Sequence, residues 1–249
     1  RQAEPFISPD VRGALFFPND WQVENRKLLA ALKRYAEINS IEILENARAE
    51  RLTVDDGRVI GAETQTEAIT ADKTVLATGA WTSLIKLGLT ELPVKIEPVR
   101  GQIVAFRSAQ RLFEHVIYSR RGYIVPRADG RILAGSTSEN SGFDKSVTES
   151  AAASLRQIAS EIAPSTARLQ VSDHWSGLRP FAVDGLPVLG EIAGLDGLTI
   201  ATAHYRNGIL LAPLTAKIVS DNLVSEKVSG YFEIFGPDRF RLRSAGTGK

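Results

Sequence analysis

The 249-residue sequence contains no cysteine and no methionine. Without cysteine it can form no disulfide, thiolate nucleophile or cysteine-ligated zinc or iron–sulfur centre. Redox chemistry would therefore need a bound cofactor. The three histidines, His115, His174 and His204, lie far apart and lack the HExxH-type spacing that places two ligands on one helix face. We expect no metal site.

The sequence also lacks an excess of charge of either sign. Lys and Arg total 30 and Asp and Glu total 29, which leaves a formal net charge of +1. Without a long basic run, nucleic acid is not an expected partner. No apolar run approaches the roughly 18 residues of a membrane-spanning helix, and the first residues do not resemble a secretion signal. These absences favour a cytoplasmic protein without a membrane span.

The composition is that of a folded globular protein. Apolar residues make up 43% and charged residues 24%, close to the averages for such proteins. The length suits one large domain or two interleaved domains. Because the sequence begins at Arg1 and has no initiator methionine, we expect a processed or truncated product, or an incomplete sequence.

The first part of the chain predicts helical and extended elements in alternation. Residues 11–18 look extended, and a helix should begin near Gln22. Leu28, Leu32 and Tyr35 recur there at i, i+4 and i+7, which predicts a helix with one buried face.

Strand signals follow this helix. Ile41 and Ile43 alternate as in a short strand, and apolar segments on both sides of Asp55-Asp56-Gly57 predict a hairpin, because Gly readily adopts positive φ. Residues 74–81 (TVLATGAW) read as a buried strand that runs into a glycine turn, with a helix over 81–87. Together these elements indicate an α/β layer.

From residue 93 the pattern changes to that of an antiparallel sheet. The extended segments are GQIVAFR (101–107), HVIYS (115–119), GYIVPR (122–127) and RILAGST (131–137). A helix over 148–163 should follow, with Leu155, Ile158 and Ile162 on one face and Pro164 at its end. We expect this helix to pack on the strands.

A second α/β stretch covers residues 181–228. The strand LTIATAH (198–204) leads into a helix in which Pro213 suits the first turn. Because this stretch and residues 18–90 are separated by the antiparallel block, we predict that one domain is inserted in another. The polar tail 236–249 should fray.

Several common catalytic motifs are missing. The sequence contains no G-x-G-x-x-G, no G-x-x-x-x-G-K-[ST] and no G-x-S-x-G. It therefore has no glycine loop that would cradle a phosphate and no serine hydrolase elbow.

Arg179 and Tyr123 can each be interpreted as an ordinary structural residue or as a functional one. Arg179 lies among Trp, Leu and Phe, where a surface arginine with a packed stem is the commoner outcome, but a guanidinium in an apolar wall is suited to hold a carboxylate through two hydrogen bonds. Strand alternation sends Tyr123 and Val125 to one face and Ile124 to the other. The ordinary role of Tyr123 is that of a core or rim aromatic.

The strand-to-helix junction 203–210 (AHYRNGIL) has two readings as well. A helix start presents free backbone N–H groups that favour an anion or an electron-rich oxygen, and Gly208 allows a flat ligand to approach. An ordinary loop with glycine as a turn residue is equally consistent with these residues.

Five stretches, in this order and spacing, carry a resemblance to a known family. They are VLATGAWTS (75–83), PVRGQIVAF (98–106), GYIVPRADGRILAGSTSENSGFDK (122–145), WSGLRPFAVDGLPVLG (175–190) and ATAHYRNGILLAPLTAKIV (201–219). The chain resembles the flavin-dependent amine oxidoreductases of the D-amino-acid oxidase superfamily, and most of all the glycine oxidase branch found in thiamine biosynthesis.

The resemblance implies a fold and a domain order. The fold is α/β plus antiparallel-rich α+β, with an incomplete FAD domain interrupted by a substrate domain that has a large antiparallel or mixed sheet. Residues 1–17 would be a substrate-domain strand, 18–90 the middle of the FAD domain, 91–180 the substrate domain and 181–249 the C-terminal part of the FAD domain.

The resemblance also implies roles for individual residues. Arg179 would clamp the substrate carboxylate, Tyr123 would add a hydroxyl hydrogen bond, Arg206 would border the active site, and Arg121 would tune substrate choice. The residues implied to line or contact FAD are Ala49, Thr78, Gly79, Trp81, His204, Arg206, Asn207, Gly208, Ile209 and Leu210.

The sequence departs from the family in two places. The family's N-terminal strand, glycine loop and helix, with its ribose-binding Glu, is absent, which puts FAD affinity in question. Ala203 stands where relatives usually carry Gly before His, which would alter how closely this backbone meets the flavin.

The expected function is FAD-dependent oxidation of glycine or another small amino acid or amine to the imine, followed by hydrolysis to keto acid and ammonia. Dioxygen would be the acceptor and hydrogen peroxide a product. The alternatives are a D-amino-acid dehydrogenase, a sarcosine-oxidase-like enzyme, or a non-catalytic fragment that lacks the nucleotide half. Whether the chain forms a homo-oligomer stays open.

Overall fold

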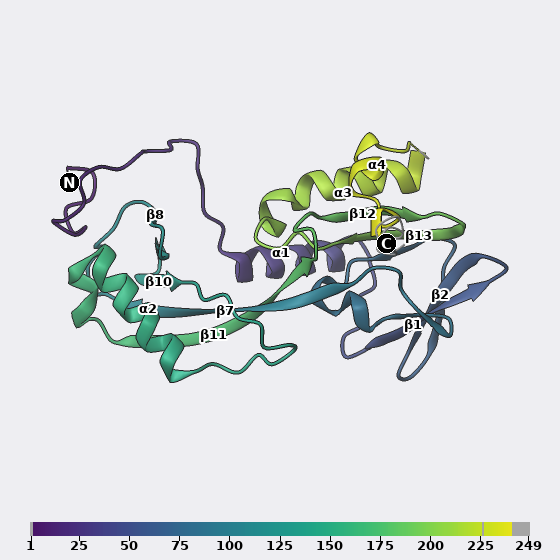
Figure 1. The fold of residues 1–249 in the computed structure, drawn as a ribbon, viewed down its shortest axis with the longest axis horizontal. Coiled ribbons are helices and arrows are strands. Elements are labelled where there is room, and N and C mark those ends of the chain that lie inside the picture. Colours follow the sequence, from purple (N-terminus) through teal and green to yellow (C-terminus); the bar gives the residue numbers. More distant parts are fainter. Residues whose placement is uncertain (1, 226, 241–249) are drawn as a thin grey trace, which may run out of the picture. The chain divides into compact units, whose positions relative to one another are not determined.

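The chain folds into two compact units, each made from two separate segments. The computed structural model describes residues 2–225 and 227–240 (Figure 1). Unit 1 comprises Arg1–Ala30 and Arg100–Leu178, and unit 2 comprises Ala31–Val99 and Arg179–Lys249. The chain thus passes between the units after residues 30, 99 and 178, where the sequence analysis places the domain boundaries after residues 17, 90 and 180.

Unit 1 is built on a five-stranded sheet with the order β11-β7-β10-β9-β8. Its strands are β7 (Ile96–Arg107), β8 (Ile117–Tyr118), β9 (Tyr123–Pro126), β10 (Arg131–Gly135) and β11 (Val171–Ala182). The pairs β7–β10, β10–β9 and β9–β8 are antiparallel. The expected antiparallel block is therefore present, and Gly130 makes the β9–β10 turn with a φ of 84°.

Helix α2 (Glu149–Ile162) covers one face of this sheet (Figure 1). Its N-cap Thr148 accepts a hydrogen bond from the Ala151 N–H, which satisfies one of the free donors of the first turn. Leu155 and Ala159 pack with Phe106 and Ile124 of the strands into a buried core. The predicted helix over 148–163 is confirmed. It could be predicted because its apolar spacing and its terminating proline are both local signals.

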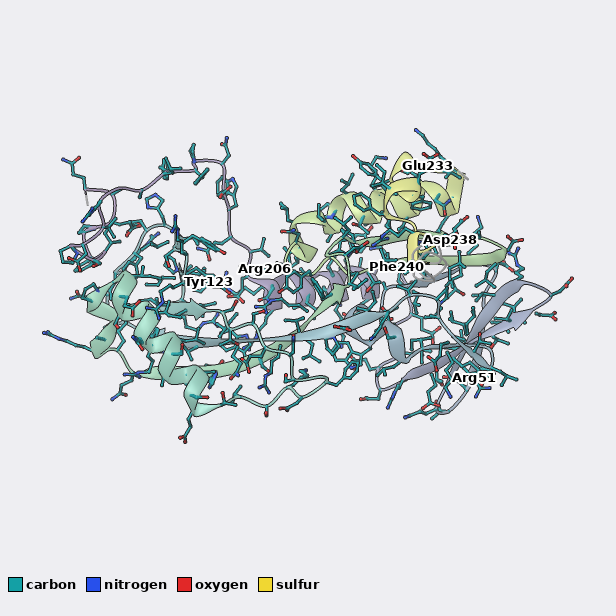
Figure 2. All side chains as sticks on the ribbon, in the orientation of Figure 1. Arg51, Tyr123, Arg206, Glu233, Asp238 and Phe240 are labelled. Atoms are coloured by element: carbon teal, nitrogen blue, oxygen red, sulfur yellow. The ribbon has the colours of Figure 1, made fainter. Side chains whose placement is uncertain are left out.

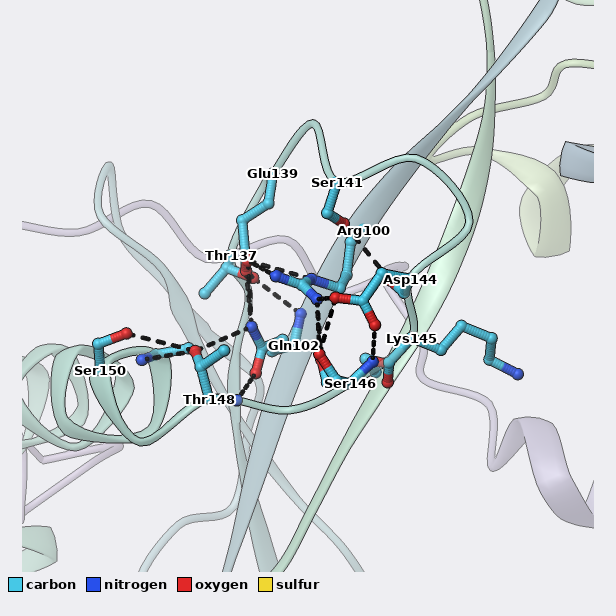
Figure 3. A network of polar contacts seen from close by, with 12 residues as sticks. Arg100, Gln102, Thr137, Glu139, Ser141, Asp144, Lys145, Ser146, Thr148 and Ser150 are labelled. Atoms are coloured by element: carbon cyan, nitrogen blue, oxygen red, sulfur yellow. Dashed lines mark hydrogen bonds and ion pairs between the residues drawn. The ribbon is translucent and has the colours of Figure 1, made fainter.

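A buried arginine organises the loop between β10 and α2 (Figure 3). Arg100 on β7 donates to the Glu139 carboxylate from Nε and Nη2 over 3.1 and 2.6 Å, and from Nη1 to Asp144 over 2.7 Å. The Gln102 amide donates to Glu139 over 2.9 Å and accepts from the Thr148 N–H over 2.9 Å. The loop is thereby joined both to β7 and to the N-terminus of α2.

Hydrogen bonding in this network determines the charge of Glu139. Burial alone would raise the pKa of its carboxyl, but hydrogen bonds from Thr137, Arg100 and Gln102 outweigh burial and lower that pKa below its ordinary value. Glu139 is therefore held as a carboxylate.

Unit 2 contains a mixed sheet. Along its main path the order is β12-β13-β2-β1-β5-β6, while β3 pairs with β2 and β4 pairs with β13. The strands are β1 (Ala49–Asp55), β2 (Arg58–Thr64), β3 (Ala68–Thr70), β4 (Thr74–Leu76), β5 (Lys86–Leu87), β6 (Thr90–Glu91), β12 (Val188–Ile192) and β13 (Leu195–Thr202). The predicted β1–β2 hairpin is confirmed, with Asp56 and Gly57 at positive φ of 41° and 76° in its turn.

Helices α3 (Gly208–Ser225) and α4 (Gly230–Phe235) lie together beside β12 and β13 (Figure 1). Ile218 and Val219 of α3 meet Leu189 of β12 and Phe232 of α4 in a small buried cluster. Pro213 lies inside α3 and not in its first turn, because the helix already begins at Gly208.

The N-terminal part of the chain differs from expectation. Residues 11–17 have no strand assignment, so the expected strand within 1–17 does not form among the described residues 2–17. Helix α1 (Asn25–Ile38) starts later than Gln22, and of its residues only Ala36 is buried. The expected buried face is wrong for this chain, because the described residues place no apolar layer over Leu32 and Tyr35, which stay exposed.

Two further local predictions have different outcomes. Residues 41–44 form no strand, since alternation of only two isoleucines does not by itself supply a pairing partner. The helix expected over 81–87 is a 3₁₀ helix, Gly79–Leu84.

The C-terminal segment is held in place as far as residue 240. Arg239 donates from Nε to the Asp184 carboxylate over 2.8 Å and from Nη2 to the Pro187 carbonyl over 2.9 Å. Asp238 accepts from the Ala193 N–H over 2.8 Å, so that Asp238 and Phe240 lie beside β12 and β13 (Figure 2). The predicted fraying is therefore wrong for residues 236–240, and residues 241–249 lie outside the described part of the chain.

Candidate functional site

The candidate site lies in unit 2, where two parallel strands end side by side. β4 and β13 are paired in parallel, with Leu76 opposite Ile200. The carboxyl ends of neighbouring parallel strands are the usual place for ligands in α/β sheets. After β4 comes the Gly79 turn, which we define as residues 78–84, and after β13 comes the β13–α3 loop, residues 203–207.

The Gly79 turn combines an open backbone with an exposed aromatic ring. Gly79 has a φ of +56°, and a Cβ built there would meet no atom within 4 Å. The Trp81 N–H donates to the Thr78 carbonyl over 3.0 Å, while 44% of the Trp81 residue surface stays exposed. The turn therefore offers space and an apolar surface for a ligand.

The β13–α3 loop has an unusual backbone. Ala203 and Tyr205 both adopt left-handed conformations, with φ of 59° and 50°. Such conformations cost non-glycine residues about 1–2 kcal/mol and often mark functional sites. Glycine would adopt this conformation without that cost, and Ala203 holds it although it is buried.

Helix α3 begins at Gly208, at the end of this loop. A Cβ at Gly208 would meet only the His204 Cβ at 3.8 Å, an ordinary contact. The N–H groups of the first turn have no acceptor within the helix, and the following Ile209 and Leu210 are exposed, Leu210 at 78%. The start of α3 therefore leaves space beside Gly208 and exposes the apolar side chains of Ile209 and Leu210.

His204 is fixed by helix α3. Its Nε2 lies 2.9 Å from the Thr215 Oγ1. Burial lowers the pKa of the imidazole from its ordinary value. His204 is therefore neutral at pH 7, and it contributes a dipole to the loop and no full charge.

Two contacts join the end of β11, which carries Arg179, to the β13–α3 loop, which carries Arg206. The Tyr205 N–H donates to the Pro180 carbonyl over 3.1 Å, and the Tyr205 ring meets the Phe181 ring edge-on with centroids 5.1 Å apart. Arg179 is half-buried near the end of β11. Arg206 is exposed before α3 (Figure 2). Asn207 is also exposed and donates its N–H to the His204 carbonyl over 2.9 Å.

Tyr123 belongs to unit 1, at the start of β9. It lies opposite Gly135 of β10, and a Cβ at Gly135 would come within 2.5 Å of the Tyr123 Oη. Gly135 therefore makes room for the phenol. The predicted alternation of β9 is confirmed, because Ile124 is buried and Tyr123 is half-buried.

Tyr118 was missed by the sequence analysis as a neighbour of Tyr123. The two rings are stacked with centroids 6.1 Å apart and an interplanar angle of 18°. Their spacing within the HVIYS and GYIVPR segments, one on each strand of the β8–β9 hairpin, is the signal that could have identified the pair. Arg121, in the connection between these strands, forms an ion pair with Glu161 of α2.

Ala49 lies elsewhere in the sheet of unit 2. It is the first residue of β1 and pairs with Thr64, the last residue of β2. Because β2 is antiparallel to β1 and parallel to β13, the start of β1 points in the direction of the carboxyl end of β13.

Metal and membrane features are not found in the described residues. Within residues 2–225 and 227–240, no group of three or more His, Asp or Glu is arranged to hold a metal ion. No helix in the described part of the chain has the length and apolar character to cross a membrane.

The fold and this strand-end site define a class of protein. The family described as FAD dependent oxidoreductase, DAO, matches residues 1–222. The chain belongs to this family.

Within the family, the chain is similar to several glycine oxidases. It is 42% identical to the glycine oxidase of Pseudomonas aeruginosa over 225 residues, which cover 88% of this chain and 60% of that protein. It is 36% identical to the bifunctional protein ThiO/ThiG of Trichormus variabilis over 99% of this chain and 37% of that protein. The crystal structure of glycine oxidase from Geobacillus kaustophilus matches with a TM-score of 0.87 and 32% identity, over 96% of this chain and 64% of that one. The chain thus spans about three fifths of the length of the glycine oxidases it matches.

Proposed function

We propose that this chain forms the substrate-binding part and much of the flavin-binding part of an FAD-dependent oxidase that acts on glycine or a similarly small amine-bearing acid. The observation that carries the proposal is the strand-end site of unit 2. It places the residues that the family resemblance assigns to FAD, Thr78, Gly79 and Trp81 on one side and the 204–210 segment on the other, at the ends of two paired parallel strands.

The site fits a flat ligand with an electron-rich edge. The open space at Gly79 and Gly208 would accept a ring system, because a Cβ at either position meets no atom closer than 3.8 Å. Trp81, Ile209 and Leu210 offer apolar surface beside it. The first turn of α3 carries N–H groups without an acceptor in the helix and the positive end of the helix dipole, which would stabilise a negative charge beside it by about 0.3–2 kcal/mol.

The substrate carboxylate would bind to Arg179, whose guanidinium can hold it through two parallel hydrogen bonds. The family resemblance separately implies that the Tyr123 hydroxyl donates a hydrogen bond to the substrate. Tyr118 would keep the Tyr123 ring in orientation through their stack. Arg206, which is exposed within the β13–α3 loop, would border the candidate site.

When bound, FAD would supply the two-electron redox chemistry: the substrate amine would be oxidised to the imine and dioxygen would be reduced to hydrogen peroxide. The chain's own contribution to the reaction is orientation. A carboxylate held by two hydrogen bonds from one guanidinium restricts the orientation of the substrate, and such fixation supplies a large part of the rate in cofactor enzymes. No side-chain general base is needed if the amine binds in its neutral form.

The deciding assay is reaction of the FAD-loaded protein with glycine, sarcosine and D-alanine. We expect the flavin absorption to bleach under anaerobic conditions with at least one of the three, and peroxide to form in air. Bleaching without peroxide would show a dehydrogenase. A well-folded protein that takes up FAD and is bleached by none of the three would overturn the proposed reaction, and one that takes up no FAD would favour a non-catalytic fragment.

A further inference from the structure

A chain of buried hydroxyl groups joins the two halves of the candidate site. Thr82 belongs to the Gly79 turn and Thr202 is the last residue of β13, and they are 0% and 2% exposed. Their Oγ1 atoms lie 3.1 Å apart. The Thr82 hydroxyl thereby links two segments that are 120 residues apart in the sequence.

Both hydroxyls also converge on one backbone carbonyl. Thr82 Oγ1 lies 2.8 Å and Thr202 Oγ1 lies 3.1 Å from the Gly79 oxygen. Thr78 Oγ1 adds a third hydroxyl, 3.1 Å from Thr82 Oγ1. Each hydroxyl carries one proton. A chain in which Thr78 donates to Thr82, Thr82 to Thr202 and Thr202 to Gly79 uses all three.

The three threonine hydroxyls lie where the two halves of the candidate site meet. One end fixes the carbonyl of Gly79, the residue at positive φ in the turn after β4. The other end lies directly before Ala203, the first left-handed residue of the β13–α3 loop. The hydroxyls therefore set the separation of the Gly79 turn and the strained β13–α3 loop at the point where both leave the sheet.

We propose that Thr82 and Thr202 are positioning residues: their hydroxyls form a clamp that holds the Gly79 turn and the β13–α3 loop at the spacing the flavin needs. The ligand part of this inference rests on the proposed function, whereas the clamp itself is a property of the chain alone. Strained conformations such as those of Ala203 and Tyr205 persist only when the surroundings hold them, and the hydroxyl groups of Thr202, Thr82 and Thr78 supply part of that restraint.

The test removes each hydroxyl without changing the shape of the side chain. Thr202→Val and Thr82→Val are nearly isosteric, and Thr202→Ser keeps the hydroxyl. Thr199→Val is the matched control, since Thr199 is 2% exposed in the same strand and takes no part in the clamp. Two variants on different segments keep the test decisive if one of them fails to fold.

The first measurement is amide hydrogen exchange of the full chain without added flavin. The amides of Trp81, Tyr205 and Asn207 are all hydrogen-bonded and are the reporters. We expect their exchange to rise about fivefold to tenfold in both valine variants, as loss of one net hydrogen bond implies, and to stay unchanged in Thr199→Val and Thr202→Ser. The β1–β2 hairpin amides, in the same unit, should not respond in any variant.

The second measurement is FAD binding followed by flavin fluorescence. Thr202→Val and Thr82→Val should weaken binding about fivefold to tenfold while Thr202→Ser restores it. Unchanged exchange at the three reporter amides in both valine variants would overturn the clamp, as would a rise that spreads equally over the β1–β2 hairpin. Altered exchange with unaltered FAD affinity would keep the clamp and overturn its role for the flavin. A wild-type chain that binds no FAD would count against the proposed function, while the exchange result still decides the clamp.

Discussion

The backbone N–H of Tyr205 donates a hydrogen bond to the carbonyl of Pro180 over 3.1 Å. This bond joins the end of β11 to the loop after β13, two segments that the sequence separates by more than twenty residues. Arg179 precedes Pro180, and Arg206 follows Tyr205. One backbone contact thus sets the positions from which both arginines extend.

The first prediction concerns Arg179. Arg179→Ala should lower kcat/KM for glycine by the equivalent of roughly 2–5 kcal/mol, because the substrate carboxylate would lose a paired charge in a desolvated site. Arg179→Lys should restore activity only in part, since an ammonium group offers no planar pair of donors. Steady-state kinetics of FAD-loaded protein give the answer, with Arg156→Ala on the exposed face of α2 as the control. Near-normal kcat/KM in Arg179→Ala with normal FAD content would overturn the role of Arg179 in binding the substrate carboxylate.

The second prediction concerns Gly208. Gly208→Val should leave the fold intact, because the nearest atom to a Cβ there is 3.8 Å away, yet it should fill the space we assign to the flavin. We expect FAD binding, and sulfite binding to the flavin, to weaken by about tenfold or more, which corresponds to about 1.4 kcal/mol. Gly230→Val is the matched control: Gly230 is the first residue of α4, and its Cβ would meet no atom within 4 Å. Equal FAD and sulfite affinity in the two variants would show that the β13–α3 loop is an ordinary connection.

The third prediction concerns acid stability and Glu139. Its pKa is lowered in the folded protein from an ordinary value of 4.5, so the unfolded state binds the proton more tightly. The stabilisation is then fully present above about pH 4.5 and is lost as the pH falls through the lower, native pKa. Glu139→Gln should melt at a lower temperature than wild type at pH 7, and the difference should shrink below pH 4.5.

Thermal melts between pH 7 and pH 3 check this. Glu91→Gln, at an exposed site on β6, should shift the melting temperature little at any pH. A Glu139→Gln difference that stays constant from pH 7 to pH 3 would mean that the Arg100 network does not hold Glu139 as a carboxylate.

The fourth prediction concerns Arg239. Its ion pair with Asp184 is largely buried, with side-chain exposures of 16% and 6%. Arg239→Met should reduce the free energy of unfolding by roughly 3–5 kcal/mol, because the largely buried Asp184 carboxylate would lose the guanidinium charge that balances it. Arg34→Met, which breaks an exposed pair with Glu37 on α1, should cost no more than about 0.5 kcal/mol. Urea unfolding of the two variants measures both changes. Similar unfolding midpoints would show that the Arg239–Asp184 pair contributes no more to stability than the exposed pair.

Local elements with strong signals can be predicted from the sequence alone. The Asp55-Asp56-Gly57 turn requires positive φ, so the β1–β2 hairpin follows from two or three residues. Helix α2 follows from its apolar spacing between Thr148 and Pro164, and the alternation of β9 from the period of a strand. The ordered motifs also identified the family, because each motif is short and continuous in the chain.

Features that depend on partners distant in the sequence are visible only in the three-dimensional structure. Whether the apolar face of α1 is buried depends on a covering layer, and whether Ile41 and Ile43 form a strand depends on a neighbouring edge, so neither could be predicted from periodicity. The convergence of Thr82 and Thr202 on the Gly79 carbonyl and the Arg239–Asp184 pair both join segments that are distant in the sequence. The sequence specifies each of these side chains, but only the parallel pairing of β4 with β13 and the return of the chain onto β12 bring the groups of unit 2 within hydrogen-bond distance.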